Sequence, residues 1–478
     1  MPPHDTAPPA PSLATTWFAL LAAYRDVVRQ ERLFVRLIAL AVAVVLGLGR
    51  QLPTRWLVTL GAGAGDWTAW YRLFSRDRLH LATLHGTLVA QVLAATPATD
   101  LVIAVAVDAT QLPRTSGKLP GGGIARALRG LCWPRGLTFA QRYVGISALL
   151  PRSADGDSRA LPLKWQRLRS ATTRPMGDEP ERTEAQGARE LVGWVRGHLD
   201  AARRVAQRLL VLGDGVYSTA PMLADLPKNV TVLARCARNR ALFALPTHRA
   251  AGRGRQPRYG DRGPTPQGTL HEATTWQAAV VRVRGRTIPL TATVTGPWLI
   301  QGAPFQPLAL IVVRGVDRGK GVSRRQRDPQ FFLVTVEMTQ EDEWSLPIPL
   351  ADLLAWAWQR WEVEVMHREL KSGFGLGQQQ AFSARGAATV VPWLVWLYAL
   401  LILTGYRTWG LGPGGVPELG RWYTARRWSI GRLRQGLRQE LWGLGEFQPV
   451  WTPSPDDWAE ITAWVQTQTT AVAAARPL

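Results

Sequence analysis

The chain has 478 residues, which is enough to bury a large core and favours more than one domain. It carries 57 Lys and Arg against 35 Asp and Glu, and the resulting formal charge of +22 indicates a polyanionic partner, either nucleic acid or an anionic membrane surface. Two cysteines, Cys132 and Cys236, exclude a disulfide framework or a cysteine zinc module, favour a reducing cytoplasmic setting and are expected to be small core hydrophobes.

The first 97 residues divide into two parts. Residues 1–14 form a Pro-rich tail that is expected to be disordered, and residues 15–97 form a helical region that is expected to bind DNA. Within it, GDWTAWYRLFSRDRL predicts a helix capped by Asp66. Its basic residues either meet DNA phosphates or form an ordinary solvated face, and both interpretations stay open; they are Arg72, Arg76 and Arg78.

Two apolar runs raise the question of membrane insertion. LIALAVAVVLGLG, from Leu37, is too short to span a bilayer, and VVPWLVWLYALLILTGY, from Val390, is of borderline length. The Pro-rich tail lacks the pattern of a secretory signal. We therefore predict that both runs are core helices and that the protein has no membrane partner.

Strand signals begin with LVIAVAVDATQL, from Leu101. Its first seven residues are apolar, as in a strand buried on both faces, and the strand is expected to end in Asp108. Two further strands, QRYVGISALLP and ALPLKWQRL, complete a predicted three-stranded meander. The loop RTSGKLPGGG lacks the spacing of a nucleotide-binding P-loop. Its glycines are expected to make it flexible, and Arg114 and Lys118 are candidate DNA contacts.

A second acid follows a second apolar strand. A helical stretch from Glu184 to Arg208 leads into RLLVLGDGVYSTAPML, where Arg208 to Leu212 is predicted to be a strand and Ser218 to Leu226 a short helix. Asp214 stands at the tip of this strand. An isolated Asp-Gly pair is usually only a turn former. Because Asp108 also follows an apolar run, we favour a functional site that contains both acids.

Residues 230–338 are rich in strands and in basic residues. The segment from Arg235 to Arg262 contains eight Arg and a single acid, Asp261, and a second basic cluster begins at Arg314. Such loops are either solvated surface or contacts to a phosphate backbone, and two clusters in so basic a chain favour nucleic acid. The candidate DNA contacts here are Arg238, Arg253 and Arg255.

No Pro or Gly interrupts the chain from Ala351 to Lys371, which predicts one long helix. One face is expected to be an apolar stripe against the core, formed by Leu354, Trp358, Trp361 and Val365. A second face is expected to present charge and is formed by Arg360, Glu364, His367 and Lys371. Surface pairing of Arg360 with Glu364 is the plainer interpretation.

Three other residues of this stretch are expected to have different roles. Glu362 and Glu369 lie off the charged face and are expected to pair with Arg. His367 could contact DNA or a metal-bound water, or be a hydrogen-bonded spectator.

An acid at each of two strand ends, followed by a Glu on a helix beyond a strand-rich insertion, resembles the DDE transposases of bacterial insertion sequences. The insertion-sequence-four branch carries a Tyr-x2-Arg-x3-Glu-x6-Lys signature, and Arg360, Glu364 and Lys371 match its spacing, while Ala357 departs from its Tyr. The resemblance implies an α/β fold with an RNase H-like core in residues 98–229 and 339–385. Residues 230–338 would be the insertion and residues 386–478 a helical C-terminal region.

The resemblance also implies a function and its residues. Asp108, Asp214 and Glu364 would hold Mg²⁺, or Mn²⁺ in its place, for phosphodiester cleavage and strand transfer. Arg360 and Lys371 would grip the phosphates of a DNA end. The implied partners are the element's terminal inverted repeats, target DNA and a second copy of the chain on DNA. A transposase-derived DNA-binding protein without catalysis and a membrane-surface protein are the alternatives.

Overall fold

The computed structural model describes residues 12–443, apart from 29, 63–64, 98, 127–135, 151–156, 171–172, 174–179, 247–255, 284, 316–327, 339–342 and 416–425. Most of the predicted N-terminal tail, Cys132 and two of the predicted DNA contacts, Arg253 and Arg255, lie outside the described residues. Cys236 is described, is partly buried and packs against the core as expected.

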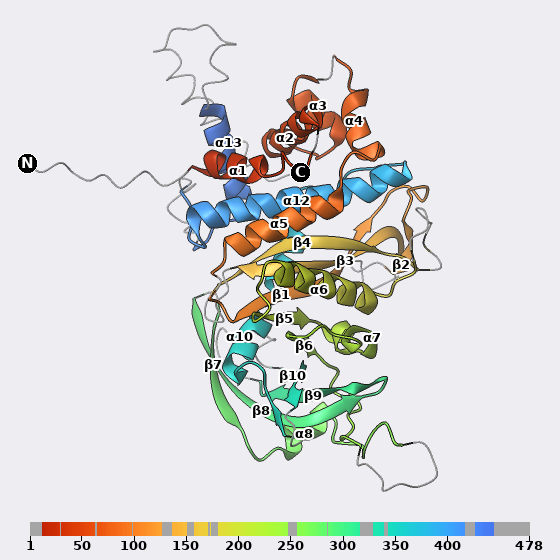
Figure 1. The fold of residues 1–478 in the computed structure, drawn as a ribbon, viewed down its shortest axis with the longest axis vertical. Helices are drawn as coiled ribbons and strands as arrows, with labels where there is room; N and C mark the ends of the chain where they lie inside the picture. Colours follow the sequence, from red (N-terminus) through yellow and green to blue (C-terminus); the bar gives the residue numbers. More distant parts are fainter. Residues whose placement is uncertain are drawn as a thin grey trace, which may run out of the picture.

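Helices from the two ends of the chain pack together beside the sheet (Figure 1). The N-terminal helices are α1 (Leu13–Ala22), α2 (Glu31–Leu46), α3 (Pro53–Thr59), α4 (Thr68–Ser75) and α5 (Leu81–Ala94). From the C-terminal part, α12 (Ala384–Trp409) packs against α1, α4 and α5, and α13 (Ile430–Gly443) packs against α1 and α2. The segments before and after the sheet therefore form one helical layer.

The two apolar runs are core helices, as predicted. The run at Leu37 lies in α2, whose buried residues include Leu37, Leu40 and Val44. Of the described helices, α12 is the one long and apolar enough to cross a membrane, but 89% of its most apolar window is buried inside the protein. Its hydrophobicity is therefore accounted for by packing against the other helices and the sheet.

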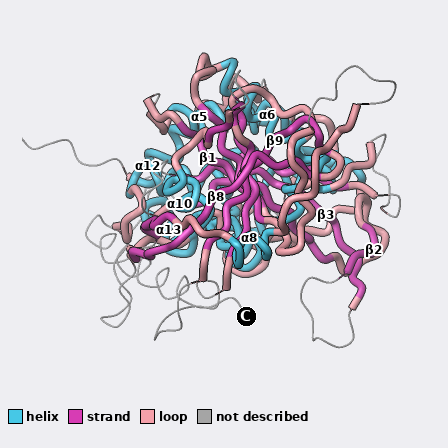
Figure 2. Tube along the Cα trace, turned by 90° about the horizontal axis from the view of Figure 1, so that it is seen from below, coloured by secondary structure: helices cyan, strands magenta, loops and turns pink. Residues whose placement is uncertain are grey.

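One mixed sheet of ten strands forms the centre of the molecule (Figure 2). Its order is β2-β3-β1-β5-β6-β10-β9-β8-β7, with β4 also paired to β3. The first strands along the chain are β1 (Val102–Pro113), β2 (Gly123–Arg126), β3 (Leu137–Leu150) and β4 (Arg159–Leu168). Because β1, β3 and β4 are successive antiparallel partners, the predicted meander is confirmed. The sequence did not predict β2, which lies in the Gly-rich loop. A Cβ on Gly122 would lie 2.3 Å from the Phe139 ring, so close packing limits the conformational freedom of this loop.

The helix α6 (Glu184–Ala201) crosses from β4 to β5 (Arg208–Gly213), which runs parallel to β1. A short 3₁₀ turn (Gly215–Ser218) and α7 (Ala220–Leu223) follow, where the sequence predicts one short helix. The next strand, β6 (Val230–Arg235), is parallel to β5. This order of a meander, a crossover helix and parallel strands confirms the predicted α/β fold with an RNase H-like core and helical flanks.

The strands of the predicted insertion continue the same sheet. They are β7 (Gln277–Val283), β8 (Arg286–Ile300), β9 (Ala303–Val313) and β10 (Gln330–Thr335), with α8 (Pro266–Glu272) before them and the small pair β11 (Glu337–Met338) and β12 (Trp344–Ser345) after them. β10 is antiparallel to β6, and β9, β8 and β7 follow in order out to the edge.

The predicted single helix from Ala351 to Lys371 is wrong in its continuity. It consists of α10 (Leu350–Gln359), α11 (Glu362–Arg368) and a π-helical turn (Glu369–Gly373). Between α10 and α11, the backbone N–H of Trp361 bonds three residues back, to the Trp358 carbonyl at 3.4 Å. Trp and β-branched residues crowd this stretch and hold a regular helix less well than unbranched ones.

Candidate active site

Asp108 stands inside β1 and not at its end. The predicted end of the strand is wrong because β1 continues along β3 to Pro113, with Asp108 directly opposite Gly145. The pairing with β5 stops earlier, at Ala106 and Leu212. Asp108 therefore marks the point where β1 loses its parallel neighbour, and its carboxylate lies at an opening in the sheet.

Asp214 lies just beyond the end of β5. It stands two residues after Leu212, as Asp108 stands two residues after Ala106, so the parallel register brings the two acids side by side. The Asp214 side chain caps the following turn, because its Oδ1 accepts the Val216 N–H at 2.9 Å. This capping fixes one carboxylate oxygen and makes Asp214 a turn former and a site candidate at once.

Glu364 comes to the same place from α11, which packs against β1 and β4. The buried residues of α10 and α11 are Leu353, Leu354, Ala355, Trp356, Gln359, Glu362, Val363 and Met366. Of the predicted apolar stripe, Leu354 is buried and Trp358 is partly buried against the core, whereas the prediction is wrong for Trp361 and Val365, which are partly buried outside that core. The broken helix rotates the buried face, yet Glu364 still lines a cleft together with Ala109 and Thr110, the two residues after Asp108.

The three acids interact electrostatically. The pKa of Asp108 is raised to about 7: burial is the largest cause, Arg360 opposes the rise, and the charges of Asp214 and Glu364 add to it. Within the described residues, no three His, Cys, Asp or Glu side chains lie close enough together to hold a metal ion as they stand. The donor set still fits a hard divalent cation, because three partly buried carboxylates repel one another and a cation between them would offset their charge.

Arg360 and Lys371 flank Glu364 as the spacing predicts. The Arg360 side chain is 11% exposed, and its Nη2 lies 3.4 Å from Glu364 Oε1. Lys371 lies in the π-helical turn and lines, with Glu364, a cleft of about 570 Å³. Other residues of this cleft are Thr110, Gln111, Thr138, His367, Arg368 and Ser372. A cationic cleft thus leads away from the acids.

The two off-face acids pair with Arg as expected. Glu362 is buried and accepts hydrogen bonds from both terminal nitrogens of Arg427, the shorter at 3.0 Å. Glu369 binds Arg159 at 2.6 Å and accepts a hydrogen bond from the Tyr398 hydroxyl at 2.7 Å. These pairs attach α11 and the π-helical turn to β4, to α12 and to the segment before α13.

The remaining predicted DNA contacts differ in their exposure. Lys118 and Arg238 are exposed. Arg114 is 7% exposed, and its guanidinium donates to the Gln141 side chain and to the carbonyls of Gly377 and Gln379. The expectation that Arg114 contacts DNA is therefore corrected: its donors are used inside the protein.

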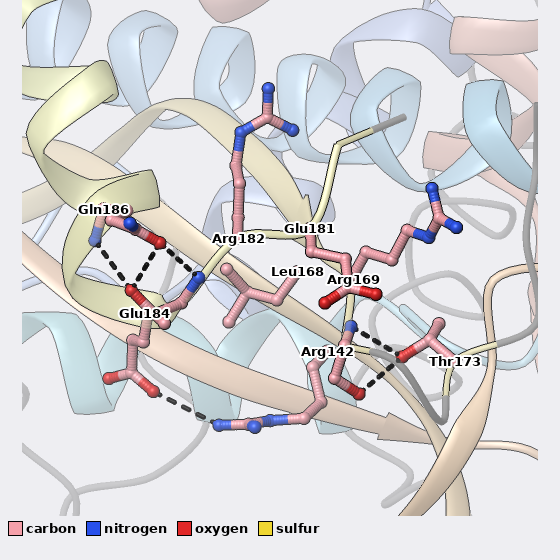
Figure 3. Close-up of a pocket in the computed structure, with 10 residues that line it drawn as sticks. Arg142, Leu168, Arg169, Thr173, Glu181, Arg182, Glu184 and Gln186 are labelled. Carbon is pink, nitrogen blue, oxygen red and sulfur yellow. Dashed lines mark hydrogen bonds and ion pairs between the residues drawn. The ribbon is translucent and has the colours of Figure 1, made fainter. Parts of the chain in front are cut away.

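A polar network beside Asp214 escaped the sequence analysis. Tyr217 donates from its hydroxyl to Glu184 Oε1 at 3.0 Å. Figure 3 shows the second contact, in which Arg142 donates to Glu184 Oε2 at 3.2 Å. Burial, followed by the charge of Asp214, raises the pKa of Glu184, while the Tyr217 hydrogen bond opposes the rise. Arg142 and Glu184 of this network line a second cleft of about 500 Å³. No local pattern reveals it, since its three residues come from β3, α6 and the turn after β5.

Comparison with known families adds an independent finding. A family model described as DDE superfamily endonuclease matches residues 54–295, just over half of the chain. The matched range contains Asp108 and Asp214 and ends before Glu364. No curated protein matches the chain.

Proposed function

The chain belongs to the DDE superfamily endonucleases, and we propose that it is the transposase of an insertion sequence of the insertion-sequence-four type. It would bind the terminal inverted repeats of its element, cut there and join the ends to target DNA. The observation that carries the proposal is that Asp214, after β5, and Glu364, on α11, are near enough to Asp108 of β1 for their charges to add to the rise in its pKa, of which burial is the larger cause. Family membership supports the endonuclease part, and the spacing of Arg360, Glu364 and Lys371 supports the branch.

In this proposal Asp108, Asp214 and Glu364 hold Mg²⁺, with Mn²⁺ as a substitute. Divalent cations bound there would activate the attacking oxygen and stabilise the leaving oxygen of the phosphodiester. The buried acid at β1 needs such charge compensation, because burial and two acidic neighbours disfavour its ionised form. Mg²⁺ prefers oxygen ligands such as these three carboxylates, whereas zinc sites are built mostly from Cys and His.

Basic residues of the chain would orient the DNA. Arg360 already lies against Glu364, where it lowers the pKa of Asp108, and can pair with the scissile phosphate while limiting repulsion among the acids. Lys371 lines the cleft that leads from Glu364 and suits a phosphate further along the strand. Lys118 and Arg238 are exposed and would contact the backbone of the duplex.

The wider assignment follows the same proposal. The helical region of residues 15–97 would bind the repeats, and two copies of the chain would bring two ends together on DNA. Residues 230–338, with their basic segments, would extend the DNA surface. The protein would act in the bacterial cytoplasm, where its DNA substrate is found.

The test is a cleavage and strand-joining assay with Mg²⁺ on DNA carrying the ends that flank this gene. Wild type should cut and join, and Glu364→Gln should lose at least about a thousandfold in rate while retaining DNA affinity. Glu337→Gln is the matched control, because Glu337 is an exposed acid that pairs only at the surface with Arg208. It should behave as wild type.

The outcomes separate the proposal from its rival. Binding without cutting by both wild type and Glu364→Gln would favour a DNA-binding protein that has lost catalysis. Equal cutting by both would remove Glu364 from the site. Failure of wild type to bind duplex DNA would overturn the proposal as a whole.

A further inference from the structure

We infer that His367, supported by Trp165 above Gly145, is a positioning residue that orients the Asp108 carboxylate for metal binding. The inference rests on the proposed metal site and deepens it. The sequence pattern places His367 on the charged face of the predicted helix. In the structure its side chain is only 12% exposed and faces Asp108. Its role follows from how three strands and α11 meet at this point.

Asp108, Gly145 and Trp165 form one row across the sheet. Asp108 of β1 is paired with Gly145 of β3, and Gly145 is paired in turn with Trp165 of β4. Directly paired residues of neighbouring antiparallel strands point to the same face. The carboxylate and the indole are therefore on one face, separated by a residue without a side chain.

Gly145 is required for this arrangement. A Cβ at this position would lie 2.5 Å from Trp165 Nε1 and 2.6 Å from its Cδ1, which no real side chain tolerates. The Trp165 indole thus lies over the glycine and toward Asp108, and it is 3% exposed. Its conformational freedom is limited further by the Tyr143 ring, whose centroid is 6.0 Å away.

The opposite face of β3 is covered by α6. Val144 points away from Gly145 because consecutive strand residues alternate, and it is met by Gly187 of α6. The face with Asp108 is covered by α11 instead, through contacts such as Met366 Sδ to the Ser147 hydroxyl at 3.4 Å. His367, the neighbour of Met366, enters the site from this cover.

His367 joins the indole to the acid. Its ring stands edge-on to Trp165, with centroids 5.4 Å apart and planes at 86°. Its Nδ1 lies 3.6 Å from Asp108 Oδ2, while Asp108 Oδ1 accepts the Ala109 N–H at 3.0 Å. One oxygen is thus fixed by the backbone and the other faces the imidazole. The 3.6 Å contact is slightly longer than a hydrogen bond, as is common at sites without substrate.

A purely structural role would not require histidine. Packing against Trp165 needs only a flat ring, which phenylalanine supplies. A polar ring edge beside a carboxylate that binds a metal is useful because residues in contact with metal ligands orient them, and removing such a contact typically lowers metal affinity about 10–100-fold. The comparison of His367→Phe with His367→Asn therefore separates packing from positioning: Phe keeps the ring, and Asn keeps a polar nitrogen at the Nδ1 position.

The experiment measures Mn²⁺ affinity of the full chain without DNA, by electron paramagnetic resonance, with Asp108→Asn to identify the site. We expect His367→Phe to weaken binding about 10–100-fold with an unchanged melting temperature, and His367→Asn to recover part of the loss. Gly145→Ala should reproduce the effect of His367→Phe by displacing the indole. Gly193→Ala is its control, because a Cβ on Gly193 of α6 would meet nothing within 4 Å.

The outcomes distinguish this inference from the proposed function. Wild-type Mn²⁺ affinity in His367→Phe overturns the positioning role, whatever the protein does to DNA. Absence of Asp108-dependent Mn²⁺ binding in wild type overturns both this role and the metal site. Weakened binding in His367→Phe together with a wild type that does not cut DNA supports the positioning role and counts against the transposase.

Discussion

Two cations four residues apart in one loop have opposite environments. Arg114 is buried, and its guanidinium connects the end of β1 to Gln141 and to the backbone after the signature helices. Lys118 is exposed. Charge counts treat the two alike, but a buried guanidinium must have its donors satisfied inside the protein, whereas an exposed ammonium is available to a phosphate.

Arg114→Met is expected to lower the free energy of unfolding by about 3 kcal/mol, because it leaves several buried acceptors without their donor. The midpoint of urea unfolding measures this loss. Lys118→Ala is expected to change that free energy by less than about 0.5 kcal/mol and to reduce the salt dependence of DNA binding by about one phosphate contact. The reverse result, a stable Arg114→Met that binds DNA poorly, would contradict the buried role.

The site could be predicted from the sequence only in part. Asp108 and Asp214 each follow an apolar run, and Glu364 has basic residues at helical spacing around it, so local patterns single out all three as candidates. The contribution of Gly145 and Trp165 depends on strand register, because each acts only by lying opposite a residue far away in the chain. Register between distant strands leaves no local signal.

At the scale of elements, side chains of α13 bind the start of α1 and the end of α2. Glu440 accepts the backbone N–H groups of Leu13 and Ala14 at the start of α1. Arg434 and Arg438 donate to carbonyls at the end of α2, among them Val45 and Gly47. An acid at a helix N-terminus and bases at a C-terminus satisfy free backbone groups and complement the helix dipoles.

Arg434→Met is expected to loosen the C-terminal turn of α2. Arg434 is 8% exposed and also donates to the Gly373 carbonyl at 3.0 Å, so its loss should cost about 2–4 kcal/mol of unfolding free energy. Hydrogen exchange should rise in residues 40–50 before it rises in the sheet. Arg76→Met, at an exposed arginine after α4, is the control. Unchanged exchange in α2 would show that Arg438 alone suffices.

At the scale of the whole molecule, the predicted insertion is an extension of the core sheet. Its individual strands are visible in the sequence as β-branched apolar runs, but their order is not, because β10 returns beside β6 before the sheet continues outward to β7. At the outer edge, β7 packs against α10. The segment between Asp214 and Glu364 therefore supports the helix that leads to Glu364.

Removing the outer strands tests this support. Arg235 of β6 pairs with Phe332 of β10, which places residue 237 opposite residue 330, so residues 238–329 can be replaced by a two-residue Asn-Gly turn that joins the two strands as a hairpin. We expect β1 and β5 to keep their protection from hydrogen exchange, while α10 loses its β7 partner and exchanges at least tenfold faster. DNA cleavage should be lost, because Glu364 no longer has a fixed approach to Asp108.

A shorter deletion, of residues 316–327 alone, leaves β7 to β10 in the chain and is the control for loss of basic residues, since it removes several Arg and none of these four strands. It should weaken DNA binding but keep the protection of α10 and the ability to cut saturating DNA. If the larger deletion also kept α10 protected and cut DNA, the outer strands would serve only to bind DNA. The distinction matters because it decides whether the long separation of Asp214 from Glu364 in sequence is a structural requirement of the site or an appended surface.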